Sequence, residues 1–93
     1  MNTLTETQIN ERLTNLKDWE YSDKSLRKEF LFEDFKQALN FIVRIGFEAE
    51  KQGHHPNLCN VYNKVSIQLN THDAGDQVTQ KDIDLATAIE NIF

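Results

Sequence analysis

The spacing of apolar residues along the chain changes abruptly at Gly53. Before it, in FEDFKQALNFIVRIGFEAEKQG, apolar residues recur every three or four positions; from Asn57 onward they alternate every second position. The first spacing is that of a helix buried along one side, and the second is that of a strand. Glycine commonly occupies the position that ends a helix. The chain must therefore combine one long helix with strands, and neither an all-α nor an all-β fold fits.

The long helix is apolar over an unusually wide arc. One predicted stripe consists of Phe35, Ala38, Leu39, Ile42 and Gly46, and an offset second stripe consists of Phe41 and Ile45. Glu33 and Asp34 are expected in its first turn, where negative charge suits the helix dipole. A helix with so wide an apolar arc usually buries both sides. In a chain this small, we expect the second side to meet another subunit.

Two further helices and two hairpins are predicted around the long helix. The first helix runs from about Glu6 to about Leu16 and begins with the capping-box spacing of Thr5 and Gln8. A first hairpin pairs residues 19–21 with residues 26–32 across a turn at residues 22–25. The last helix begins at Thr79 and Asp82, and its expected buried face is Ile83, Ala86, Ile89 and Phe93.

The second hairpin follows Gly53. Its first strand covers residues 57–62, with a tight turn expected at Asn63 and Lys64. In its second strand, Val65, Ile67, Leu69 and Thr71 face one way, while Ser66, Gln68, Asn70 and His72 face the other. The predicted class is therefore α+β, in the order α-β-β-α-β-β-α, with a four-stranded antiparallel sheet and three helices packed on one face. Residues 1–93 suit a single domain, and the open face of the sheet is left for a subunit or a ligand.

Composition excludes several kinds of protein. The net charge is −5, so binding to a nucleic-acid backbone is disfavoured. No apolar run reaches the length of a membrane span, and the polar first residues do not resemble a secretion signal. We therefore expect a cytoplasmic protein. Cys59 is the single cysteine, which rules out an internal disulfide and a cysteine-rich zinc site.

All three histidines lie between Glu50 and Asp73. His54 and His55 follow the long helix directly, and His72 follows the last strand of the second hairpin. Imidazole gives and takes protons near neutral pH, and a neighbouring carboxylate fixes its tautomer and raises its basicity. Glu50 lies one helical turn before the pair, and Asp73 follows His72. The pattern predicts a proton-transfer site.

Other interpretations of these residues stay open. Three imidazoles can hold zinc with a free fourth position, but adjacent residues of an extended chain, such as His54 and His55, point in opposite directions. Any one histidine at a helix end can simply cap carbonyl groups. Trp19 is either a core residue or a wall for an aromatic ligand.

The run HHPNLCNVYNKVSIQLNTHD resembles the pterin-4a-carbinolamine dehydratase family. The Glu-Lys before the histidine pair, Trp19, Phe30-Leu31-Phe32 and the Asp-Ile-Asp-Leu-Ala of the last helix also match. The resemblance covers nearly the whole chain. It implies the same order of helices and strands, and an enzyme that removes water from a 4a-hydroxytetrahydropterin to give the quinonoid dihydropterin. This reaction recycles the tetrahydropterin cofactor of aromatic amino-acid hydroxylases.

The resemblance also implies site residues and partners. The catalytic residues would be His54, His55 and His72, with no metal and no organic cofactor. The substrate-binding residues would be Trp19, Glu50, Pro56, Asn70, Thr71, Asp73 and Ala74. The partners would be a small pterin substrate and further copies of the chain, as a homodimer or homotetramer. Elimination of water needs an acid and a base, and we expect His54 and His72 to be that pair, with His55 orienting the substrate.

The chain also departs from the family pattern. Gly53 stands where relatives often carry a polar or acidic residue, and residues 73–81 form a loop one residue longer than in animal relatives. Some members of the family act as protein partners, including a coactivator of a homeodomain transcription factor, and others assist the assembly of another enzyme. A non-enzymatic binding or assembly role on the same fold is therefore the alternative hypothesis.

Overall fold

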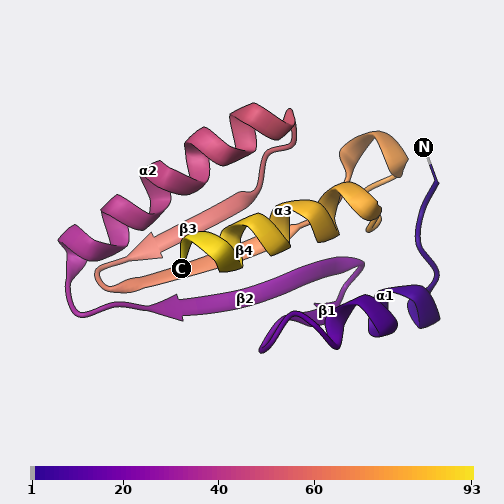
Figure 1. The fold of residues 1–93 in the computed structure, drawn as a ribbon, viewed down its shortest axis with the longest axis horizontal. Helices are drawn as coiled ribbons and strands as arrows, with labels where there is room; N and C mark the ends of the chain where they lie inside the picture. Colours follow the sequence, from indigo (N-terminus) through magenta and orange to yellow (C-terminus); the bar gives the residue numbers. More distant parts are fainter. Residues whose placement is uncertain (1) are drawn as a thin grey trace.

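The computed structural model describes residues 2–93 and contains the predicted order of elements (Figure 1). The helices and strands are α1 (Glu6–Leu13), β1 (Glu20–Ser22), β2 (Ser25–Leu31), α2 (Phe35–Gln52), β3 (Asn57–Val61), β4 (Lys64–Leu69), the short 3₁₀-helix η1 (His72–Ala74) and α3 (Gln80–Ile92). The four strands form one antiparallel sheet in the order β1-β2-β4-β3. The predicted α+β class, with three helices on one face of an antiparallel sheet, is confirmed.

The core lies between the sheet and its helices. Strands β2 and β4 occupy the centre of the sheet, and alternate residues of β4 (Val65, Ile67 and Leu69) are buried. They pack in one apolar cluster with residues of all three helices, including Ile9 of α1, Ile45 of α2 and Ile89 of α3. The opposite sheet face carries mainly polar side chains, such as Arg27, Glu29 and Gln68, together with the exposed Leu31 and Val61. No helix formed by residues 2–93 combines the length and the apolar character needed to cross a membrane.

Side-chain caps define the helix ends. Thr5 and Gln8 bond reciprocally at the start of α1, and Thr79 and Asp82 do the same at the start of α3, so both predicted capping pairs are present. At the end of α2, Gly53 adopts a left-handed conformation with φ of 65°. The amide of Gly53 donates to the carbonyl of Glu50, and the amide of His54 donates to the carbonyl of Ala49. This Schellman motif fixes the direction in which the chain leaves α2.

Several predicted boundaries were wrong by a few residues. Helix α1 ends at Leu13 and not near Leu16, because the chain continues as turns that still bury Leu16. Asp34 is the N-cap of α2, with its carboxylate accepting from the amide of Gln37, so Glu33 and Asp34 precede the first turn of the helix.

The second hairpin also differs from its prediction. Its turn is formed by residues 62–63, and β4 already begins at Lys64. Strand β4 ends at Leu69, so His72 lies in η1 and not at the end of the strand.

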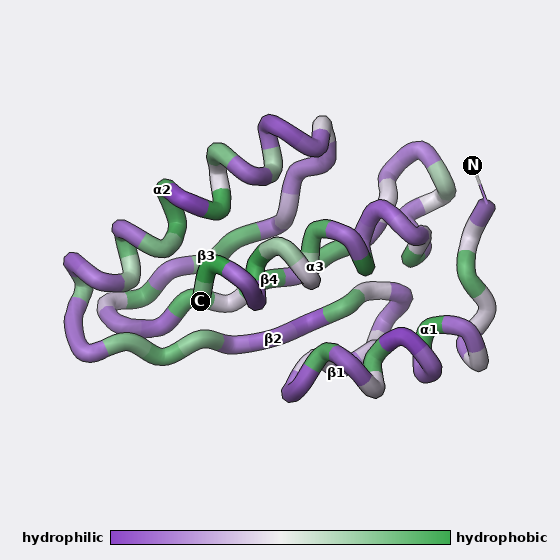
Figure 2. The backbone as a smooth tube through the Cα atoms, in the orientation of Figure 1, coloured by the Kyte–Doolittle hydropathy of each residue, from purple (hydrophilic) through white to green (hydrophobic). Residues whose placement is uncertain are grey.

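The predicted burial of α2 was correct for only part of the helix. Its buried residues are Ala38, Phe41, Ile45 and Ala49, which follow mainly the stripe expected to be secondary. Phe35, Leu39, Val43 and Phe47 are 46–76 % exposed and form a second apolar row. Figure 2 shows apolar residues recurring along the length of this helix. Phe93 was also expected to be buried and is 60 % exposed, although its ring contacts Phe30, Phe32 and Phe41.

Candidate active site

One pocket brings the three histidines together. It has a volume of about 360 Å³ and lies where α2 ends, β3 begins and β4 ends. It is lined by Gly53, His54, His55, Pro56, Asn57, Gln68, Asn70, Thr71, His72, Asp73 and Lys81. The sheet explains this convergence. Since β3 and β4 are antiparallel and Asn57 pairs with Gln68, residues just before β3 lie beside residues just after β4.

A larger hollow of about 470 Å³ lies mainly on the open face of the sheet. Its lining includes Arg27, Glu29, Cys59 and Ser66, but no histidine. Size alone would favour this hollow. The smaller pocket is the candidate active site because it gathers the groups that exchange protons near neutral pH.

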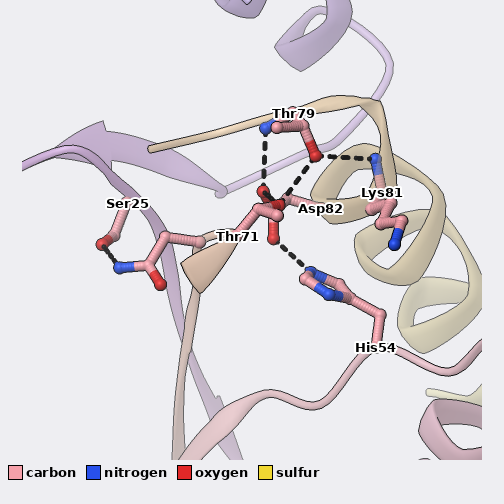
Figure 3. Close-up of polar contacts among 7 residues, drawn as sticks. Ser25, His54, Thr71, Thr79, Lys81 and Asp82 are labelled. Atoms are coloured by element: carbon pink, nitrogen blue, oxygen red, sulfur yellow. Dashed lines mark hydrogen bonds and ion pairs between the residues drawn. The ribbon is translucent and has the colours of Figure 1, made fainter. Parts of the chain in front are cut away.

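His54 is the most firmly held of the three histidines. It is 9 % exposed, and its Nε2 lies 2.5 Å from Oδ1 of Asp82, which is completely buried (Figure 3). The other carboxylate oxygen of Asp82 accepts from the Thr71 hydroxyl at 2.8 Å and from the Thr79 amide at 2.9 Å. Both oxygens of this carboxylate are therefore held by fixed partners. With Nε2–H donated to Asp82, the imidazole carries its lone pair on Nδ1.

His55 is held on the outside of the pocket by Glu50. The Nε2 of His55 and Oε1 of Glu50 are 2.7 Å apart, and both side chains are exposed. The contact agrees with the expectation that Glu50, one turn before the pair, reaches back toward it. Because water surrounds this pair, it orients the ring more than it stabilises the fold.

His72 is fully exposed at the pocket rim. Its Nδ1 lies 2.9 Å from Oδ1 of Asp76, four residues later. The hydrogen bond to Asp76, together with the negative charges of Asp76 and Asp73, raises the pKa of His72 above its ordinary value of 6.5. With Nδ1 occupied by Asp76, Nε2 is the nitrogen left for a ligand.

The pocket contains most, but not all, of the residues expected from the sequence. His54, His55, His72, Pro56, Asn70, Thr71 and Asp73 line it. Glu50 acts on it through His55, and Ala74 in η1 is not among the lining residues. The structure does not bring Trp19 to the pocket. Its indole is buried in the core and donates to Glu90 at 2.8 Å.

Sequence reasoning missed five polar residues of this site, among them Asn57 and Gln68 of the lining. Asp82 was interpreted only as the capping residue of the last helix, although it also holds His54. Asp76 bonds His72 in place of the adjacent Asp73, and Lys81 joins the pocket from α3. An acid four residues after a histidine was the available signal for Asp76. The contact of Asp82 with His54 depends on tertiary packing and leaves no local signal.

The alternative of a metal site depends on the arrangement of possible ligand side chains. Within residues 2–93, no group of three or more His, Cys, Asp or Glu side chains is arranged to hold a metal ion. Each imidazole is instead directed toward a carboxylate of its own: His54 toward Asp82, and His72 toward Asp76.

Known proteins share this architecture. The family model described as pterin 4 alpha carbinolamine dehydratase matches residues 2–92. The chain belongs to the pterin-4a-carbinolamine dehydratase family. A relative from Christiangramia forsetii, provisionally named a pterin-4-alpha-carbinolamine dehydratase, is 51% identical over 99% of this chain and 94% of its own length. Another with the same provisional name, from Sulfurisphaera tokodaii, is 44% identical over 100% of this chain and 99% of its own.

Solved structures of similar proteins are described with different roles. A crystal structure described as a transcriptional coactivator/pterin dehydratase from Brucella melitensis superposes with a TM-score of 0.92 at 38% identity, covering 98% of both chains. A pterin dehydratase-like protein described as a RuBisCO assembly factor in the α-carboxysome gives a TM-score of 0.65 at 20% identity, covering 80% of this chain and 84% of its own. The second likeness shows a shared fold alone. The description of the Brucella melitensis protein names two roles for that one protein.

Proposed function

We propose that this protein is a 4a-hydroxytetrahydropterin dehydratase that uses its three histidines and neither a metal nor an organic cofactor. The observation that carries the proposal is the convergence of His54, His55 and His72 on one pocket of about 360 Å³. A volume of this order suits a bicyclic ligand. Family membership over residues 2–92 supports the same reaction class.

His54 and His72 suit opposite halves of the elimination. Dehydration breaks the C4a–O bond, removes the proton on N5 and forms a C4a=N5 double bond, releasing water. His72, whose pKa is raised by Asp76 and Asp73, is the acid that donates a proton from Nε2 to the departing hydroxyl. His54 is the base that takes the N5 proton on Nδ1, and the buried Asp82 stabilises the resulting imidazolium.

The remaining lining residues hold the substrate. His55, oriented by Glu50, contacts the ring, and Pro56 stiffens the segment that carries both histidines. Asn70 and Asp73 offer polar groups to the substrate, whereas the buried Thr71 hydroxyl is bonded to Asp82 and holds that carboxylate in place. Trp19 and Ala74 have no direct part in this arrangement, since neither lines the pocket.

A direct test measures dehydration of a 4a-hydroxytetrahydropterin. We expect His54→Ala and His72→Ala each to lower kcat by about 10²–10⁴-fold, the usual contribution of a positioned acid or base. Lys36→Ala, on an exposed part of α2 away from the pocket, is the control and should leave kcat unchanged. Wild-type protein that is no faster than buffer would refute the dehydratase. Histidine variants as fast as wild type would refute the assignment of roles.

We also propose that the protein self-associates through α2. The apolar row of Phe35, Leu39, Val43 and Phe47 has four-residue spacing and faces outward. A two-fold axis across this row would pack the same four side chains against each other, which is how helix pairs and symmetric dimers are built. The occupant proposed is a second copy of this chain. A different protein on the same row is the alternative, and it is the basis of a non-enzymatic binding or assembly role.

A further inference from the structure

A chain of hydrogen bonds runs from the open face of the sheet to the pocket. Arg27 Nη1 donates to Gln68 Oε1 at 3.1 Å, and Gln68 Nε2 donates to Ser25 Oγ at 3.2 Å. Asn70 Nδ2 donates to the same Ser25 oxygen at 3.1 Å, and the Ser25 hydroxyl donates to the carbonyl of Asp23 at 3.4 Å. Ser25 is completely buried, whereas Arg27, Gln68 and Asn70 are half-buried; Figure 3 shows the Ser25 hydroxyl bonded to an amide nitrogen.

The chemistry of its two ends favours one direction for each bond in this chain. A guanidinium only donates, so Gln68 must accept through its oxygen and donate through its nitrogen. A backbone carbonyl only accepts, so the single hydroxyl hydrogen of Ser25 is directed to Asp23 and its oxygen is left to accept. In this arrangement Asn70 bonds to Ser25 through Nδ2. A rotation of the amide by 180° would require the Ser25 hydroxyl to leave the Asp23 carbonyl and donate to Asn70 instead.

The fixed amide leaves one atom of Asn70 available for a ligand. Asn70 lines the pocket, and among residues 2–93 its Oδ1 has no hydrogen-bond partner. Every fully buried side-chain nitrogen or oxygen in that range has a partner, so this oxygen is not fully buried. The wall formed after β4 thus presents a hydrogen-bond acceptor of defined orientation.

We propose that Asn70 Oδ1 accepts hydrogen bonds from the donor edge of the pterin ring. Ser25, Gln68 and Arg27 are positioning residues that keep this oxygen, and not the amide nitrogen, directed at the ligand. This inference rests on the proposed function. If the histidines face C4a and N5, the far pyrimidine edge is left for the side chains that follow β4. That edge carries two adjacent donors, the 2-amino group and N3–H, and a carbonyl oxygen has two lone pairs to accept them.

The arrangement predicts selectivity against a closely similar ring. A lumazine carries a carbonyl at position 2 where a pterin carries an amino group, so it would set an acceptor against Asn70 Oδ1. Two acceptor oxygens that face each other in the occupied pocket weaken binding, and we expect a preference for pterin of about tenfold or more. Without Ser25 the amide can rotate and offer Nδ2 to the lumazine carbonyl, which would reduce the preference.

The test compares dissociation constants for 7,8-dihydropterin and the matching 7,8-dihydrolumazine by fluorescence titration. Ser25→Ala and Asn70→Leu should reduce the roughly tenfold preference of wild type to about threefold or less. Asn70→Asp should keep it, because one carboxylate oxygen still faces the ligand as an acceptor while the other accepts from the Ser25 hydroxyl, which turns away from Asp23. Ser22→Ala, an exposed serine in the same hairpin, is the control. The ratio of two ligands is the readout because a purely structural defect would weaken both equally.

The outcomes separate this inference from the proposed function. Wild type that binds dihydropterin, with a preference unchanged in Ser25→Ala and Asn70→Leu, would overturn the role of Asn70 and leave the dehydratase standing. Wild type that binds no pterin would overturn both. If Ser25→Ala does not fold, the comparison of Asn70→Leu with Asn70→Asp decides, since Asn70 is only half-buried.

Discussion

At the scale of single residues, Asp82 has two structural roles that can be separated experimentally. It caps α3 through the Thr79 amide and holds His54 through its other oxygen. Asp82→Asn retains an oxygen for the amide but replaces the charge that stabilises a protonated His54. We expect kcat to fall by about 10–100-fold, the usual effect of losing a partner that orients a functional histidine, with dihydropterin binding nearly unchanged. Steady-state kinetics with Asp84→Asn, an exposed acid on the same helix, as the control would measure this.

The same variant can contradict the role given to Asp82. If Asp82→Asn and wild type share the same kcat while the urea midpoint falls, the carboxylate serves only the fold. If kcat falls in proportion to the fraction of unfolded protein, the conclusion is the same.

The pH dependence of the reaction should report His72. Asp76 and Asp73 raise its pKa, so the protonated form that acts as the acid persists to higher pH than for an isolated histidine. Asp76→Asn removes the nearest charge and should move the alkaline limb of the kcat profile to lower pH, with activity at pH 8 falling more than at pH 6. NMR titration of the His72 ring should show the same downward shift. A ring pKa that falls while the alkaline limb stays in place would exclude His72 as the acid.

The sequence predicted which residues form the site better than it predicted their hydrogen-bond partners. His54, His55 and His72 were found because they cluster in two short segments, and Glu50 because helical spacing sets its reach. The partner of His54 lies 28 residues away and the relay through Ser25 spans 45, so both depend on how the strands and helices pack.

At the scale of elements, the end of α2 decides where His54 lies. Gly53 has φ of 65°, a conformation that costs a residue with a Cβ about 1 kcal/mol or more. We expect Gly53→Ala to lower the free energy of unfolding by about 1 kcal/mol and Gly53→Asn by less, because asparagine tolerates this region. Urea unfolding would measure both.

Gly46 provides a control of opposite sign for that experiment. It lies within α2, and a Cβ built there meets no atom within 4 Å. Gly46→Ala should therefore stabilise the protein by about 0.5–1 kcal/mol through helix propensity. Gly53→Ala that is as stable as Gly46→Ala would show that the left-handed turn is not needed.

The elements themselves were predictable because their signals are local. Capping pairs, the change of period at Gly53 and the alternation of β4 each arise within a few residues. The burial of α2 was not fully predictable, because two apolar rows on one helix give no indication of which row faces the sheet. Only packing against β4 and α3 selects Phe41 and Ile45 over Phe35 and Leu39.

At the scale of the whole molecule, the outward row of α2 predicts association of copies. A chain of 93 residues buries a limited share of its surface alone, and this row leaves four large apolar side chains in water. Sedimentation equilibrium should give wild type a mass that is a multiple of 10.9 kDa. Leu39→Glu combined with Phe47→Glu should reduce the number of subunits in the oligomer, for example from tetramer to dimer or from dimer to monomer, because like charges would meet across the two-fold axis. Asn40→Glu, exposed on the same helix, is the matched control. A monomeric wild type, or a double variant of unchanged mass and unchanged circular dichroism, would show that copies of this chain do not meet along α2.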